Sequence, residues 1–205
     1  VGYDGRFLMP FMPFQEMSDE DLTAVISFIR SQKPVRHEVE PSEYGFMGKA
    51  ILAFGMIKPE GPKHTPPQSV AIDSTIAYGK YLANSVGNCR FCHTEFDVNS
   101  GRQTGPDFAG GGLFPADNLS GGYAFISPNL TPDPTTGILA DWTEQMFVTR
   151  FRAGRVQHGS PMPWGSFSRM NEVDLKALYR YLHSLEPQNF YISETVFAPG
   201  EKMPD

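Results

Sequence analysis

The sequence Cys89-Arg90-Phe91-Cys92-His93 contains three side chains that can hold one cofactor together. Two cysteine thiols three positions apart can be alkylated by the vinyl groups of a haem, and an imidazole directly after the second thiol can ligate the iron. One short helical turn must present both sulfurs to the same porphyrin edge and bring His93 under the metal. The motif therefore predicts one haem c, covalently attached through Cys89 and Cys92.

Other kinds of site would use the same thiols. Cys89 and Cys92 are the only cysteines of the chain, so a zinc site would need His93 and one more histidine to complete a tetrahedron. The candidates for that fourth ligand are His37, His64, His158 and His183. A redox-active dithiol is a second alternative, although no βαβ pattern surrounds the motif. A chance occurrence of the spacing is the third.

A haem that only carries electrons needs an axial ligand on its other face. We predict Met162, because thioether sulfur is soft, prefers ferrous iron and raises the reduction potential. The prolines on both sides of Met162 stiffen its loop. His158 and Met170 are the rival ligands, and Met170 directly precedes a helix N-cap, where a packing role suits it better. The predicted metal ligands are thus His93 and Met162.

Four further residues are candidates for the haem surroundings. Arg152 and Arg155 precede the Met162 loop and can pair with haem propionates, or simply end a helix in solvent. Trp164 either lines the haem pocket, with its indole N–H toward a propionate, or packs in the core. The carbonyl of Pro106 can accept a hydrogen bond from the ring nitrogen of His93 that does not bind iron. No residue is predicted to be catalytic.

Composition limits the fold and the partners. A chain of 205 residues is long enough for one domain, or for one domain and a fragment of another. Its 20 glycines and 18 prolines predict a loop-rich fold, which a large apolar cofactor helps to hold together. The net charge of -6 argues against nucleic acid as a partner. The sequence contains no run of 18 apolar residues, so no membrane span is predicted. The first residues lack the pattern of a signal peptide.

Two helices are predicted in the first third of the chain. Ser18 suits an N-cap, and apolar residues then recur at helical spacing until Pro34 ends the helix. A short apolar segment at 46–54 is long enough for two helical turns inside a connection, residues 36–69, that is rich in proline and charge.

The rest of the chain alternates helix and loop. Asp73 is expected to cap a helix that ends near Ala83, and Gly79 to mark a close contact with Leu178 or Tyr181 of the last helix. The glycine-rich segment 109–141 is expected to be loop. Asp141 or Thr143 then begins a helix that Gly154 ends, with one face formed by Met146, Phe147 and Phe151.

An internal repeat relates the two ends of the chain. Residues 21–34 align with 174–187 at a constant offset of 153, with Asp, Leu, Ala, Ser and Pro identical. Upstream, Gly5-Arg6 and Met12-Pro13 have counterparts in Gly154-Arg155 and Met162-Pro163. The alternative is that two capped amphipathic helices merely look alike. We expect residues 1–35 to be the C-terminal fragment of a preceding domain without its CxxCH motif, residues 70–188 to be a complete domain, and 189–205 to be a tail.

The haem motif, Gly105-Pro106, the Met162 loop and the closing helix resemble the cytochrome c family, over residues 73–185. The resemblance implies an all-α, cytochrome c-like fold of few short helices around one covalent haem. More narrowly, residues 127–138, Trp142-Thr143 and Phe147 resemble the multi-haem cytochrome subunits of periplasmic alcohol and sugar-acid dehydrogenases. On this resemblance Asn129 joins the cofactor-binding candidates, and Met12 would be the axial ligand of the preceding domain.

The function implied is electron transfer in the periplasm and not catalysis. One-electron Fe(III)/Fe(II) cycling would relay electrons from a dehydrogenase to an oxidase or a quinone-linked acceptor of the respiratory chain. Two other functions remain open from the sequence. A haem enzyme such as a peroxidase, as part of a di-haem protein, would keep one coordination position free. A zinc-stabilised binding module would have no redox role.

Overall fold

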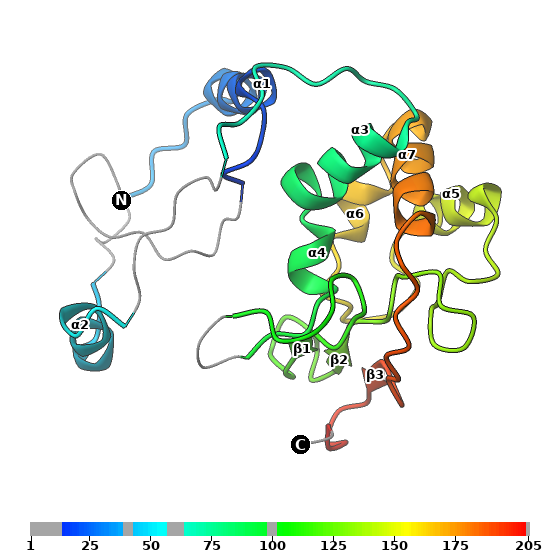
Figure 1. The fold of residues 1–205 in the computed structure, drawn as a ribbon. Coiled ribbons are helices and arrows are strands. Elements are labelled where there is room, and N and C mark those ends of the chain that lie inside the picture. The colour runs from blue at the N-terminus through cyan, green and yellow to red at the C-terminus, as the bar shows by residue number, and fades with distance from the viewer. Residues whose placement is uncertain (1–13, 39–42, 57–63, 98–101, 204–205) are drawn as a thin grey trace. The chain divides into compact units, whose positions relative to one another are not determined.

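The computed structural model describes residues 14–38, 43–56, 64–97 and 102–203 (Figure 1). The chain divides into two compact units, residues 1–70 and 71–205. Both cysteines, His93 and Met162 lie in the second unit. The predictions for Gly5-Arg6 and for Met12 as an axial ligand fall outside the described residues.

The first unit contains α1 (Asp19–Ser31) and α2 (Phe46–Ala53). Both predicted helices are confirmed, and so is the N-cap, since the Ser18 hydroxyl accepts a hydrogen bond from the Asp21 amide at 3.2 Å. The free amides of the first turn, at positions 19 and 20, donate to the carbonyls of Pro67 and Gln68 at 3.1 and 3.0 Å. The end of the predicted connection therefore contacts the start of α1.

The second unit is built around α7 (Glu172–His183), which lies alongside α3 (Ile76–Tyr81) (Figure 1). Helix α3 runs directly into a π-helical turn, η1 (Leu82–Val86). The predicted cap of α3 was wrong by two residues. Thr75 accepts from the Tyr78 amide at 3.2 Å, whereas Asp73 accepts from the amide of Thr75 at 2.9 Å. The Asp73 carboxylate thus does not accept from the first-turn amides of α3, and instead it holds Thr75, the residue that caps the helix.

Gly79 marks a close contact of α3 with α7, as predicted. A Cβ atom at position 79 would collide with the carbonyl of Ala177 and would lie 2.8 Å from the Cβ of Tyr181. Gly79 is buried, and Ala177 and Leu178 are almost completely so. Glycine is therefore required because the two backbones meet here with no room for a side chain.

The described residues of this unit contain three more helices: α4 (Cys89–Cys92), α5 (Glu144–Arg152) and α6 (Trp164–Phe167). The predicted boundaries of α5 are confirmed: Thr143 accepts from the Met146 amide at 3.2 Å, and Gly154 follows the helix at a φ of 66°. Phe147 and Phe151 are buried on its inner face, but Met146 is 48% exposed. Met146 was thus assigned to the wrong face.

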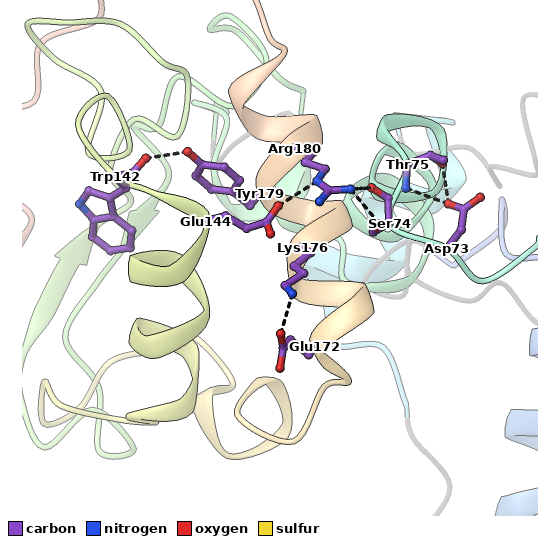
Figure 2. A network of polar contacts seen from close by, with 9 residues as sticks. All are labelled: Asp73, Ser74, Thr75, Trp142, Glu144, Glu172, Lys176, Tyr179 and Arg180. Atoms are coloured by element: carbon purple, nitrogen blue, oxygen red, sulfur yellow. Dashed lines mark hydrogen bonds and ion pairs between the residues drawn. The ribbon is translucent and has the colours of Figure 1, made fainter.

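A polar network fixes α7 to its two neighbours (Figure 2). The Arg180 guanidinium donates to the carbonyl and hydroxyl of Ser74, at 2.8 and 2.7 Å, and to the carboxylate of Glu144 at 2.8 Å. The Tyr179 hydroxyl donates to the carbonyl of Trp142 at 2.6 Å. These bonds join the segments that begin α3 and α5 to adjacent residues of α7.

The predicted all-α class misses a small antiparallel sheet of three strands, β1 (Leu113–Phe114), β2 (Ala124–Ile126) and β3 (Val196–Phe197), in the order β1-β2-β3. Leu113 pairs with Ile126, and Ala124 pairs with Phe197. Strands of two or three residues are too short to show an alternating pattern in the sequence. Two of them lie in the segment predicted to be loop, and β3 lies in the predicted tail.

In the described part of the chain, none of the helices combines the length and apolar character that a membrane crossing requires.

Candidate functional site

A cavity of about 350 Å³ lies in the second unit between the α4 motif, α5, α6 and the sheet. Cys89, Cys92, His93 and Met162, predicted to act on one cofactor, all line it. Most of the remaining wall is apolar and comes from every element around it: Phe114, Phe125, Ile126, Leu130, Ile138, Leu139, Trp142, Phe147, Phe151, Trp164, Phe167, Leu178, Leu182 and Val196. The size and the apolar wall are those of a ligand-binding cavity.

The imidazole of His93 is held by a backbone carbonyl. Its Nδ1 lies 3.0 Å from the carbonyl oxygen of Pro128. A carbonyl can only accept, so Nδ1 carries the hydrogen and Nε2 has the free lone pair. Desolvation lowers the pKa of His93, opposed by the Pro128 carbonyl. The ring is therefore neutral at pH 7, which is the form that binds a metal.

The predicted carbonyl partner, that of Pro106, was wrong. It accepts instead from the amide of Ala109 at 3.1 Å, closing a turn. Pro106 is also not among the described residues that line the cavity. The two prolines are equivalent by type, and only the path of the chain brings Pro128 next to the ring.

Asn129 has a structural position and not one on the cavity wall. It is almost completely buried. Its Oδ1 accepts hydrogen bonds from the amide and the hydroxyl of Thr131, at 2.9 and 2.7 Å. Its Nδ2 donates to the Thr136 hydroxyl and to the Gln188 carbonyl. Asp133 accepts from the amides of residues 135 and 136 in the same loop. The stretch 127–138 thus satisfies its own polar groups and holds the Pro128 carbonyl against His93.

Three consecutive glycines fit between this loop and the cysteine motif. Gly110 and Gly111 both have a φ of 84°. The Gly110 amide donates to the His93 carbonyl at 2.9 Å, and the Gly111 amide donates to the Ser127 carbonyl at 2.9 Å. A Cβ at Gly112 would collide with the carbonyl of Cys92. Side chains here would push the motif away from the loop that carries Pro128.

The cysteine environment does not match a redox-active dithiol. Desolvation raises the pKa of Cys89 to about 12 and also raises the pKa of Cys92. Redox-active CxxC motifs have a lowered thiol pKa, because the thiolate is the reactive form. Both thiols are therefore neutral at pH 7.

Two of the four histidines named for a zinc site lie elsewhere in the second unit. The ring of His158 packs on Tyr123, and Nε2 of His183 lies 3.3 Å from the carbonyl of Leu139. Neither is among the described residues that line the cavity. His158 and Met170 were also the rival candidates for the second axial ligand. Neither is among the described residues that line the cavity, whereas Met162 is.

The sequence matches curated proteins over most of its length. It is 30% identical over 199 residues to the cytochrome c subunit of an alcohol dehydrogenase (quinone) from Gluconobacter oxydans (strain 621H), which covers 89% of this chain and 40% of the relative. It is 34% identical over 161 residues to the subunit of that description from Komagataeibacter europaeus, covering 76% of this chain and 29% of the relative. The chain is homologous to cytochrome c subunits of dehydrogenases.

A third relative of this group is the gluconate 2-dehydrogenase cytochrome c subunit of Pantoea cypripedii, 34% identical over 122 residues, or 57% of this chain and 25% of the relative. The chain thus spans 40% or less of the length of these cytochrome c relatives. No family model matches the sequence.

Of the aromatic and basic residues predicted near the haem, Trp164 lines the cavity and Arg152 and Arg155 do not. Trp164 lines the cavity, but its indole N–H donates to the Ser160 hydroxyl at 3.2 Å. Arg152 and Arg155 are exposed and outside the wall, and they donate to the carbonyls of Ser168 and Ser160. The sequence reasoning missed Arg150, which does line the cavity. Its spacing of three residues from Phe147, on the inner face of α5, is the signal that could have found it.

Proposed function

We propose that this chain is an electron-transfer module that carries one covalent haem c, attached through Cys89 and Cys92 and ligated by His93 and Met162. The observation that carries the proposal is that these four side chains, 73 positions apart at the extremes, line one apolar cavity. When bound, the haem would supply the one-electron Fe(III)/Fe(II) couple. Homology to cytochrome c subunits supports the same role.

The donor set fits a haem. Two neutral thiols in a single helical turn are available for thioether formation, and the free lone pair of His93 Nε2 is available for iron. Thioether sulfur from Met162 favours the reduced metal and so a high potential. The apolar wall would keep water from the porphyrin faces, which further favours the less charged state of the iron.

The chain's own residues restrict the axial ligands. The bond from Nδ1 of His93 to Pro128 fixes the ring orientation and raises its basicity as a ligand. Prolines on both sides of Met162 reduce the backbone freedom of that loop. With His93 and Met162 both bound to the iron, no coordination position would be left for a substrate, and the site would transfer electrons.

The wider setting is part of the proposal. Residues 1–35 would correspond to the end of a second cytochrome c domain, with α1 as the counterpart of α7. In support, no described residue of α1 is buried, and its apolar side chains are exposed, namely Leu22, Val25, Ile26, Phe28 and Ile29. The module would work in the periplasm, between a dehydrogenase as donor and an oxidase or quinone-linked acceptor, through brief contacts with these partners.

The test is the substitution Met162→Ala in the haem-loaded protein. Mass spectrometry should still show one haem added to the chain, because the thioether bonds do not depend on Met162. The oxidised form should lose the methionine-to-iron charge-transfer absorption. Met170→Ala is the matched control, since it makes the same change eight positions away and outside the cavity wall, and it should keep the band.

Two results would refute the proposal. A chain that carries no haem after expression with a haem-attachment system would remove its basis. A band that survives Met162→Ala, or disappears in Met170→Ala, would assign the sixth position to another group.

A further inference from the structure

The cavity wall contains one permanently charged side chain. Among the described residues that line it, Arg150 is the sole arginine, lysine, aspartate or glutamate. The other polar lining groups are neutral at pH 7, and most of the wall is aliphatic or aromatic. A cation in such surroundings loses hydration and gains little from its neighbours unless an anion joins it.

Two contacts hold the Arg150 guanidinium in place. Its central carbon lies 3.7 Å from the ring centroid of Trp164, a cation–π geometry, and Nη1 donates to the carbonyl of Gly154 at 2.9 Å. Burial lowers the pKa of Arg150, but an arginine stays charged in proteins. A guanidinium has five N–H donors. The hydrogen bond to Gly154 uses one of them, so most of the N–H groups are available to a group in the cavity.

Arg150 has no carboxylate partner in the part of the chain that the structure describes. The ion pairs found there join Arg90 to Asp107, Lys176 to Glu172 and Arg180 to Glu144. Arg152 and Arg155 are exposed, do not line the cavity, and donate to the carbonyls of Ser168 and Ser160. What distinguishes Arg150 from these two arginines is that it lines the cavity and has no carboxylate partner among the described residues.

We propose that Arg150, positioned by Trp164 and the Gly154 carbonyl, forms an ion pair with a carboxylate of the bound haem and thereby holds that propionate beside α5. This inference rests on the proposed function and adds a positioning residue to it. The haem is the occupant with the right chemistry, because it combines a large apolar surface with two propionate groups. A planar guanidinium matches a carboxylate with two parallel hydrogen bonds.

The first test is the midpoint potential of haem-loaded Arg150→Gln at fixed pH and ionic strength. Without the guanidinium, the carboxylate charge near the iron is uncompensated and stabilises Fe(III), so the potential should shift downward. Arg150→Lys keeps the cation and should restore most of the shift. Arg152→Gln removes a charge of the same sign from the exposed side of α5, where solvent and salt screen it, and should leave the potential close to that of the unaltered protein.

A second measurement does not depend on any variant folding. In a crystal structure of the haem-loaded chain, a propionate oxygen should lie about 3 Å from an Arg150 nitrogen. Both propionates pointing away from Arg150 would overturn the inference. So would an Arg150→Gln potential equal to that of Arg152→Gln. A chain without haem would instead refute the proposed function, so the two failures are distinguishable.

Discussion

Nδ1 of His93 lies 3.0 Å from the carbonyl oxygen of Pro128, 35 positions further along the chain. The contact joins the cysteine motif to a loop whose polar groups are almost all bonded within the loop or to the segment that follows α7. A ligand imidazole is held best by an acceptor that cannot move. The 127–138 loop meets that requirement. Its Asn129, which the sequence predicted to bind the cofactor, is not among the described residues that line the cavity.

Replacing Pro128 by glycine tests this contact. The backbone that carries the acceptor gains freedom, so the ring N–H of His93 in the haem-loaded protein should exchange with solvent faster, as measured by NMR. The free energy of unfolding should fall by about 1 kcal/mol. Pro106→Gly loosens the other candidate carbonyl and should leave the exchange of the ring proton unchanged. Faster exchange in Pro106→Gly alone would return the role to Pro106.

Gly79→Ala should destabilise the second unit. The added methyl would meet the backbone carbonyl of Ala177, which cannot rotate away, so helices α3 and α7 must separate. Overpacking of this kind costs about 1–3 kcal/mol in denaturant unfolding. Gly165→Ala is the control in another helix, because nothing lies within 4 Å of the added atom. It should be neutral or stabilise the protein by about 0.5–1 kcal/mol, and equal losses in both variants would exclude the packing explanation.

The carboxylate of Asp133 should make stability depend on pH in the acid range. Hydrogen bonds from Thr135 and Thr136 lower its pKa in the folded state. A group whose pKa is lowered by folding stabilises the protein above its unfolded pKa of about 4, and this stabilisation is lost as the pH falls through the folded value. Thermal unfolding should show Asp133→Asn less stable than the unaltered protein at pH 7.

That difference should shrink as the pH is lowered below about 4. Asp141→Asn makes the same charge change at an exposed position and should not reproduce the pattern. A difference between Asp133→Asn and the unaltered protein that stays constant with pH would mean that the charge of Asp133 has no part in holding the loop.

The segment after α7 should be needed for the cavity wall. Phe197 is 4% exposed and packs with Ala124 and Ile126, and the adjacent Val196 lines the cavity. Phe197→Ala should cost about 3 kcal/mol of unfolding free energy. Tyr191→Ala removes an aromatic ring that is 78% exposed and should change stability by less than about 0.5 kcal/mol. If Phe197→Ala changed stability as little as Tyr191→Ala, residues 189–205 would be the loosely attached tail that the sequence predicted.

Local rules predicted much of the helical frame. Ser18 and Thr143 cap the helices that follow them because a hydroxyl reaches amides only three positions ahead. Gly79 revealed a contact 98 positions away because a glycine inside a helix is costly unless a neighbour needs the space. The sheet was not predicted, since strands of two or three residues are too short to show a period.

The sequence by itself predicted the chemistry proposed for this protein. Two thiols and an imidazole within one helical turn have the pattern of a haem-attachment motif, because their relative positions depend only on local geometry. Only the tertiary structure decided which distant groups contact His93 or line the cavity: Pro128 and not Pro106, Arg150 and not Arg152 or Arg155. Every proline carbonyl accepts hydrogen bonds and every arginine is a cation, so residue type cannot rank them. Their distances to the cavity follow from the packing of α5, the 127–138 loop and the sheet, which no short stretch of sequence specifies.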